Sequence, residues 1–158
     1  MIMERAIITR PAGQWPRHSA RATVTLPYDG RHRRRTRLKT DGGGWVMLDL
    51  REAAVMHDGD GLQLESGGWV LVRAADEVLA EITCDSPGRL TRIAWHLGNR
   101  HVPTQIENGR LCIRNDHVIT ELVVVLGGQV RIIEAPFDPE AGAYVSREHT
   151  NHAGIHPK

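Results

Sequence analysis

Histidine is the residue type in this sequence best suited to chemistry, and its distribution along the chain is uneven. The chain of 158 residues has nine histidines, and six of them lie in the last 63 residues. A neutral imidazole nitrogen is the commonest metal ligand of proteins near neutral pH. The clustering therefore predicts metal binding by members of the set His96, His101, His117, His149, His152 and His156. Taken singly, each could instead be an ordinary surface residue.

Other residues that could bind a metal show weaker patterns. Cys84 and Cys112 lack the close spacing of a cysteine zinc knuckle. The Asp58–Gly61 stretch lacks the spaced carboxylates of a calcium loop and is typical of a turn. A hydrolytic metal centre needs three firm ligands and a general base. The sequence has neither HExxH nor a dense Asp/His cluster, so we expect a non-enzymatic protein, with a metal-dependent hydrolase as the alternative.

Composition narrows the class of protein further. Hydrophobic residues make up 41% and charged residues 25% of the chain, as in folded globular proteins, and the net charge of +1 predicts no nucleic-acid partner. The longest apolar run, residues 122–126, is far shorter than the roughly 20 residues of a membrane span. The first residues lack the pattern of a signal peptide, so we expect a cytoplasmic protein without a membrane partner.

Residues 1–75 predict an all-β domain. Residues 1–20 are expected to be an irregular lead-in with weak strand content, and residues 27–30 a turn. Apolar residues then alternate or cluster in short segments bounded by glycine, aspartate and proline. The strand-like segments are residues 23–26, 45–50, 62–65 and 69–74.

A basic run interrupts this domain. Residues 31–39 include six arginines and lysines, and strand alternation would place Arg33, Arg35 and Arg37 on one face. We interpret the run as an edge strand that its charges keep solvated. The alternative is a docking patch for an acidic protein, with these three arginines as the contacts.

From residue 76 the pattern changes to alternating strands and helices. Ser86 and Pro87 are typical of a helix start, and Gly98 is expected to end that helix. Asp116 caps a second helix that runs to Leu126. An Asn-Gly pair at 108–109 predicts a hairpin. The residues expected to face inward are Leu90, Ile93, Ala94 and Leu97 in the first helix and Val118, Ile119, Leu122 and Val125 in the second.

The order β-α-β-β-α-β is that of a ferredoxin-like domain, so the predicted fold class is α+β. We expect an N-terminal β-domain over residues 1–75, the ferredoxin-like domain over 76–144 and a mobile tail over 145–158. Both helices should cover one face of the sheet. The other face is expected to carry aliphatic residues, which a second domain or a second copy of the chain would cover.

Three motifs resemble those of a known family. The first is the run from His96 to Pro103 (HLGNRHVP) with Gln105 and Ile106, and the second is Asp116-His117-Val118 before an apolar helix. The third is APFDPEAGAY over residues 135–144. In combination they resemble the UreE family, the nickel-carrying chaperones of urease maturation. The first half of the chain is similar to the family only in its all-β character and position.

The resemblance implies a function and a set of ligands. It implies a cytoplasmic nickel metallochaperone that delivers Ni²⁺ to the urease apoprotein together with accessory proteins, including the GTPase. It also implies a β-domain related to chaperone peptide-binding domains and a head-to-head homodimer through the C-terminal domain. His101 matches the family's metal ligand at the dimer interface, and His117 matches a weaker site. Zn²⁺ and Cu²⁺ also suit imidazole ligands.

The last residues add candidate ligands. A twofold axis would bring two copies of His101 together, and we expect His149 or His152 to complete the site from the tail. His96 lies at a helix end, where an imidazole is favoured electrostatically, and we interpret it as structural. The remaining alternative is a peptide-binding chaperone module in which the histidines are incidental.

Overall fold

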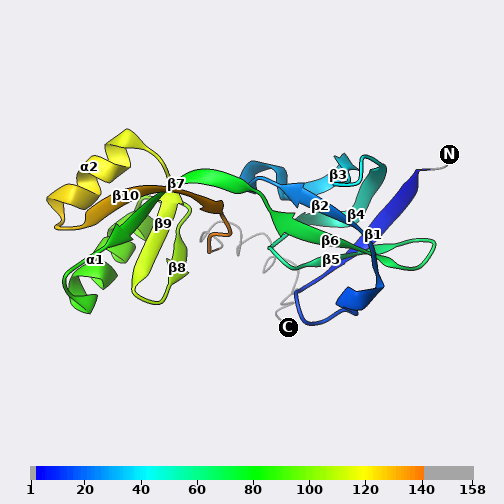
Figure 1. The fold of residues 1–158 in the computed structure, drawn as a ribbon, viewed down its shortest axis with the longest axis horizontal. Coiled ribbons are helices and arrows are strands. Elements are labelled where there is room, and N and C mark those ends of the chain that lie inside the picture. The colour runs from blue at the N-terminus through cyan, green and yellow to red at the C-terminus, as the bar shows by residue number, and fades with distance from the viewer. Residues whose placement is uncertain (1–2, 141–158) are drawn as a thin grey trace, which may run out of the picture. The chain divides into compact units, whose positions relative to one another are not determined.

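The computed structural model describes residues 3–140, which form two units divided between Asp76 and Glu77 (Figure 1). The first unit consists of strands and two 3-10 turns, and the second contains two α-helices. A β-unit followed by a βαββαβ unit confirms the predicted α+β fold class. Neither helix has the length and hydropathy of a transmembrane segment in the part of the chain described.

The first unit is built on a six-stranded sheet with strand order β2-β6-β5-β1-β4-β3. Strand β1 runs parallel to β4, and β2 runs parallel to β6. Alternate side chains of these strands form an aliphatic core that includes Val24, Leu48, Leu62 and Val72, all fully buried. The strands are β1 (Glu4–Arg10), β2 (Ala20–Leu26), β3 (His32–Lys39), β4 (Trp45–Val55), β5 (Gly61–Leu64) and β6 (Trp69–Ala74), with 3-10 turns at Arg17–Ser19 and Tyr28–Gly30.

The prediction of an irregular lead-in over residues 1–20 was wrong. Strand β1 lies inside the sheet, between β5 and β4, and Ala6 at its centre is fully buried. The sequence ERAIITR shows little alternation of apolar and polar residues, and Ala6 is the only buried residue of the strand. Pairing with strands far along the chain, and not local preference, therefore makes this segment a strand.

Asp49 on β4 binds an arginine from each of the two neighbouring strands, β1 and β3. Its carboxylate accepts a hydrogen bond from Arg35 Nε at 2.8 Å and forms an ion pair with Arg5. The hydrogen bonds from Arg35 and then Arg5 lower the pKa of Asp49 from 3.8 to about 2. A carboxylate with a lowered pKa stabilises the fold above its unfolded pKa and loses this effect as pH falls towards the folded value.

We therefore expect acid to destabilise the wild type more than D49N between about pH 4 and pH 2. Urea unfolding followed by tryptophan fluorescence measures this, because Trp15 and Trp69 stack in the first unit with ring centroids 5.4 Å apart. The matched control is E52Q at an exposed position of the same strand. Equal loss of stability in D49N and wild type over this range would contradict the prediction.

The second unit has the ferredoxin-like strand order β10-β7-β9-β8 (Figure 1). Ile93 and Leu97 of α1 and Val123 of α2 pack with Ala80 and Ile113 in one buried cluster on one face of the sheet. Local signals begin both helices as predicted, since Ser86 and Asp116 accept the capping hydrogen bonds. The elements are β7 (Asp76–Thr83), α1 (Pro87–Asn99), β8 (Gln105–Glu107), β9 (Arg110–Arg114), α2 (His117–Val125) and β10 (Gln129–Pro136).

The inward face predicted for α2 was partly wrong. Val118 and Val125 are 67% and 83% exposed, whereas Val123 is fully buried. Ile119 and Leu126, one turn to either side of Val123, pack against the core. Because the helix sequence HVITELVVV is aliphatic on several sides, its periodicity could not single out one stripe.

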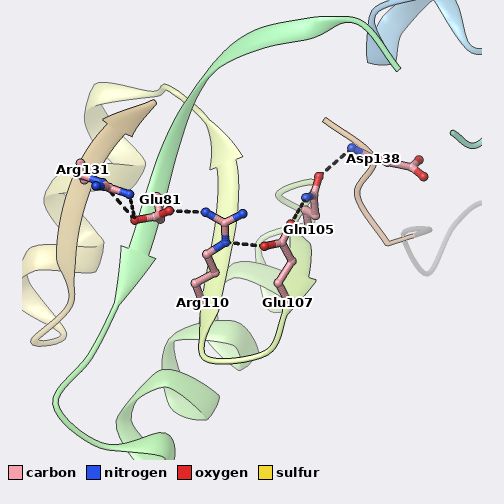
Figure 2. Close-up of polar contacts among 6 residues, drawn as sticks. All are labelled: Glu81, Gln105, Glu107, Arg110, Arg131 and Asp138. Carbon is pink, nitrogen blue, oxygen red and sulfur yellow. Dashed lines mark hydrogen bonds and ion pairs between the residues drawn. The ribbon is translucent and has the colours of Figure 1, made fainter. Parts of the chain in front are cut away.

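The second sheet face differs from the prediction only in part. Glu81 and Cys112 are paired across β7 and β9 and lie on the face away from the helix-packed Ala80 and Ile82. Glu81 is nearly buried and forms ion pairs with Arg110 and Arg131 (Figure 2). This face therefore carries a charged network in addition to aliphatic residues such as Leu79, which lies two residues from Glu81 on the same strand and is fully buried.

Candidate metal site

The backbone at the end of α1 places His101 in an uncommon conformation. The N–H of His101 donates to the carbonyl of Gly98, and the N–H of Val102 donates to the carbonyl of Leu97, both at 3.0 Å. This pair of bonds is a Schellman turn, in which the residue at the position of His101 adopts a left-handed conformation. Its φ is +58°. Gly98 was predicted to end the helix, but it lies in the last turn, and the helix ends at Asn99.

Glycine is the usual residue at such a turn because it has no Cβ. For another L-residue the left-handed conformation costs about 1–2 kcal/mol, and histidine is one of the few types enriched there. Among the described residues, His101 is the only one other than glycine with positive φ. This uncommon backbone conformation makes a functional role for the His101 side chain a hypothesis to be tested.

His101 shares a surface pocket with the start of α2. The pocket has a volume of about 270 Å³ and is lined by His101, Val102, Pro103, Arg114, Asp116 and Ile119. His101 is exposed, so its imidazole lies within reach of solvent. The end of one helix and the beginning of the other thus meet at this histidine.

The structure places His117 beside this pocket but not in its lining. His117 is the first residue of α2, and its side chain is 84% exposed. Its Nε2 lies 3.1 Å from a carboxylate oxygen of Glu121, one turn along the helix. His117 and Glu121 are thus two side chains on the outer surface of α2 that could bind a metal ion together.

The remaining histidines of the last 63 residues divide into two groups. His96 lies in the last turn of α1, and its ring contacts that of Trp95 edge-on with centroids 5.1 Å apart. The predicted tail ligands His149 and His152 lie outside the described residues. Within residues 3–140 of one chain, no three histidine, cysteine or carboxylate side chains come close enough together to hold a metal ion.

The arginines predicted as docking contacts lie on β3, which is an edge strand as interpreted from the sequence. Arg35 is hydrogen-bonded to Asp49, and the guanidinium of Arg37 lies 4.7 Å from the ring centroid of Trp45. Arg33 is exposed on the same strand. Arg31, the first residue of the basic run, is only 1% exposed and donates to the carbonyl of Met56 at 3.1 Å, so it is not part of a solvated patch.

Sequence reasoning missed two features of the second unit. One is the set of exposed aliphatic side chains, Val78, Ile106, Val118, Val124, Val125 and Ile132, each more than half exposed. The other is the polar contact between Gln105 on β8 and the backbone of Asp138. The aliphatic run of α2 signalled the first, but no signal in the sequence pairs Gln105 with Asp138.

Comparison with known proteins places this geometry in context. The N-terminal domain model of the UreE urease accessory protein matches residues 6–75, and its C-terminal domain model matches residues 77–158. A urease accessory protein UreE from Rhodopseudomonas palustris is 49% identical over 95% of this chain and 71% of its own length. Those from Beijerinckia indica and Agrobacterium fabrum are 42% and 46% identical over 96% and 90% of this chain, and over 88% of their own lengths.

Proposed function

The chain belongs to the UreE family of urease accessory proteins, and from this premise we propose that it is a metallochaperone that delivers Ni²⁺ during assembly of the urease metallocentre. The family is one of accessory chaperones and not of enzymes. The observation that carries the proposal is His101, an exposed imidazole held on left-handed backbone at the wall of a pocket. Such a side chain is a nitrogen donor on a defined backbone turn, beside a pocket of about 270 Å³.

A second copy of the chain supplies the second donor in this proposal. The exposed aliphatic side chains of the second unit include Val118, two residues from the pocket residue Asp116. Apolar surface of this kind is typical of an interface between subunits. A twofold axis at this surface would bring two copies of His101 to one ion. Imidazole pairs also bind Zn²⁺ and Cu²⁺, so selection of nickel depends on geometry and supply.

Tail histidines complete the proposed site. Glu140, the last described residue, donates its N–H to the carbonyl of Thr104 at 2.9 Å, and Thr104 is three residues from His101. His149 lies nine positions beyond Glu140, a span of up to about 30 Å when fully extended. His149 and His152 are therefore within reach of the pocket. A tethered ligand binds without diffusion from solution and can leave when the metal is passed on.

Removing the tail tests this step. A chain cut after Ser146 is expected to bind nickel at least about tenfold more weakly than the full chain, because it loses a tethered ligand. Isothermal titration with Ni²⁺ measures the affinity, and H149A and H152A separately identify which histidine contributes. Unchanged affinity and stoichiometry in the cut chain would remove the tail from the site.

The proposed partners are the urease apoprotein and its accessory proteins, including the GTPase, in the cytoplasm. Arg33, with Arg35 and Arg37, remains our proposed docking surface for an acidic partner. The test of the whole function combines nickel titration, light scattering and transfer of bound nickel to apo-urease. A shared site should give one tightly bound ion per two chains, whereas one tight ion in each monomeric chain would contradict it.

A further inference from the structure

An exposed tryptophan lies beside the basic strand β3. Trp45 is the first residue of the neighbouring strand β4 (Figure 1), pairs with Lys39 across the two strands and is 47% exposed. The guanidinium of Arg37 lies 4.7 Å from the centroid of its ring. Because Leu38 and Val46 are buried on the opposite side, these three side chains share the outer face of the sheet. The basic run itself contains no tryptophan, tyrosine or phenylalanine, so strand pairing alone supplies the ring.

Most positive charges of β3 have no negative partner within the described part of the chain. Arg35 is the exception, because it binds Asp49, which also binds Arg5. Asp41, the first carboxylate after β3, accepts hydrogen bonds from the N–H and the hydroxyl of Thr25. Within residues 3–140, no carboxylate forms an ion pair with the other arginine and lysine side chains of the strand, Arg33, Arg34, Arg37 and Lys39. This surface therefore complements a partner with several negative charges.

The pair of Arg37 and Trp45 suits a carboxylate and an apolar group at once. A guanidinium that lies over an aromatic ring keeps its N–H donors in its own plane, where they can bind a carboxylate bidentately. The contact exists before any partner binds, so less side-chain freedom is lost on association. Met47, which pairs with Arg37 and is half-buried, continues the apolar surface from Trp45 along β4. Tryptophan and arginine are also the residue types that most often dominate the binding energy of protein interfaces.

Nucleic acid fits this face less well than a protein segment does. Single strands bind through successive bases that stack on several aromatic rings. Trp45 is the only tryptophan, tyrosine or phenylalanine on β3 and β4, and the net charge of the chain is only +1. The observations thus favour a protein segment that carries both carboxylates and an apolar side chain.

We propose that Arg37 and Trp45 form the centre of the docking surface on β3, and that its partner is an acidic protein segment with an apolar side chain. The carboxylates bind Arg37 and Lys39, and the apolar side chain packs on Trp45. Arg35 contributes little to docking because Asp49 already binds it. This inference rests on the docking step of the proposed function, and it adds the chemistry of the partner and the residue that selects it.

Binding of a labelled peptide to the full chain tests the proposal. The probe has one leucine between two runs of glutamates, and fluorescence anisotropy measures its affinity. W45A is expected to weaken binding about tenfold. R37K keeps the charge but loses the planar donors, so it is expected to weaken binding about threefold. The matched controls, W95A and R92Q, change exposed residues of α1 and should bind the peptide as the wild type does.

Wild-type affinity in both W45A and R37K, or an equal loss in the two controls, would overturn the proposed centre. A peptide of glutamates alone should bind the wild type more weakly than the probe does, and W45A should not weaken it further. Equal affinity of the wild type for the two peptides would refute the apolar contact. If single-stranded oligothymidylate bound more tightly than the probe and W45A abolished this binding, the partner would be a nucleic acid instead.

Nickel titration separates this proposal from the nickel function. W45A and R37K should bind Ni²⁺ as the wild type does, because neither residue belongs to the proposed metal site. Thermal unfolding checks that each variant is folded, and R37K alone decides the outcome if W45A is not. Wild-type protein that binds the probe but no nickel would contradict the nickel function and support the docking surface.

Discussion

Replacing His101 by asparagine is expected to abolish tight nickel binding and leave the fold intact. The turn that ends α1 needs a residue that tolerates positive φ, and asparagine does so readily. The variant therefore removes the imidazole without straining the backbone. Loss of an outer contact to a metal ligand already costs 10–100-fold in affinity, so loss of the ligand from both copies should exceed about 100-fold.

Comparison with other substitutions at this position separates the ligand from the turn. H101G is expected to raise the stability of the second unit by about 1 kcal/mol, since glycine avoids the Cβ penalty, and to lose nickel as H101N does. The control H18N changes an exposed histidine of the first unit and should bind nickel normally. Calorimetric titration and thermal unfolding give both quantities. Tight nickel binding by H101N would rule out His101 as the ligand.

Placing a negative charge at Val118 is expected to separate the proposed dimer. Val118 is the second residue of α2, where an aspartate favours the helix through its dipole, so V118D should fold normally. An unpaired charge buried in an apolar interface costs several kcal/mol, which raises the dissociation constant by more than about 100-fold. Light scattering should then give the mass of one chain.

The nickel site should fail together with the dimer, because each chain would keep only its own His101. The control T91D places the same charge on an exposed position of α1 and should remain dimeric. A dimeric V118D protein with wild-type nickel affinity would show that this surface is not the interface. Monomeric V118D with one tightly bound ion per chain would contradict a shared site.

Much of the second unit could be predicted because its signals are local. Ser86 and Asp116 cap helices through their own side chains, and Asn108-Gly109 closes a two-residue hairpin with Gly109 at a φ of +80°. Strand β1 and the buried stripe of α2 were harder, because sheet partners and neighbouring helices decide them. Their sequences are compatible with more than one arrangement.

The candidate site was predictable in residue type but not in geometry. The histidine motif predicts His101 as a metal ligand, which stays a prediction, and the glycine three residues earlier suggested the wrong end for α1. Nothing local in the sequence indicates that His101 has left-handed backbone or that Gln105 contacts residue 138. Both depend on how the helix end and residues 137–140 pack on the completed sheet.

The Schellman turn at the end of α1 restricts which metals this position can be engineered to prefer. Soft sulfur donors favour Cu(I) and zinc, but cysteine at position 101 would incur about 1–2 kcal/mol of backbone strain. Histidine, asparagine and aspartate tolerate the conformation, and they offer only nitrogen or oxygen atoms. The left-handed backbone at position 101 thus limits which metal-binding residue types fit there without strain.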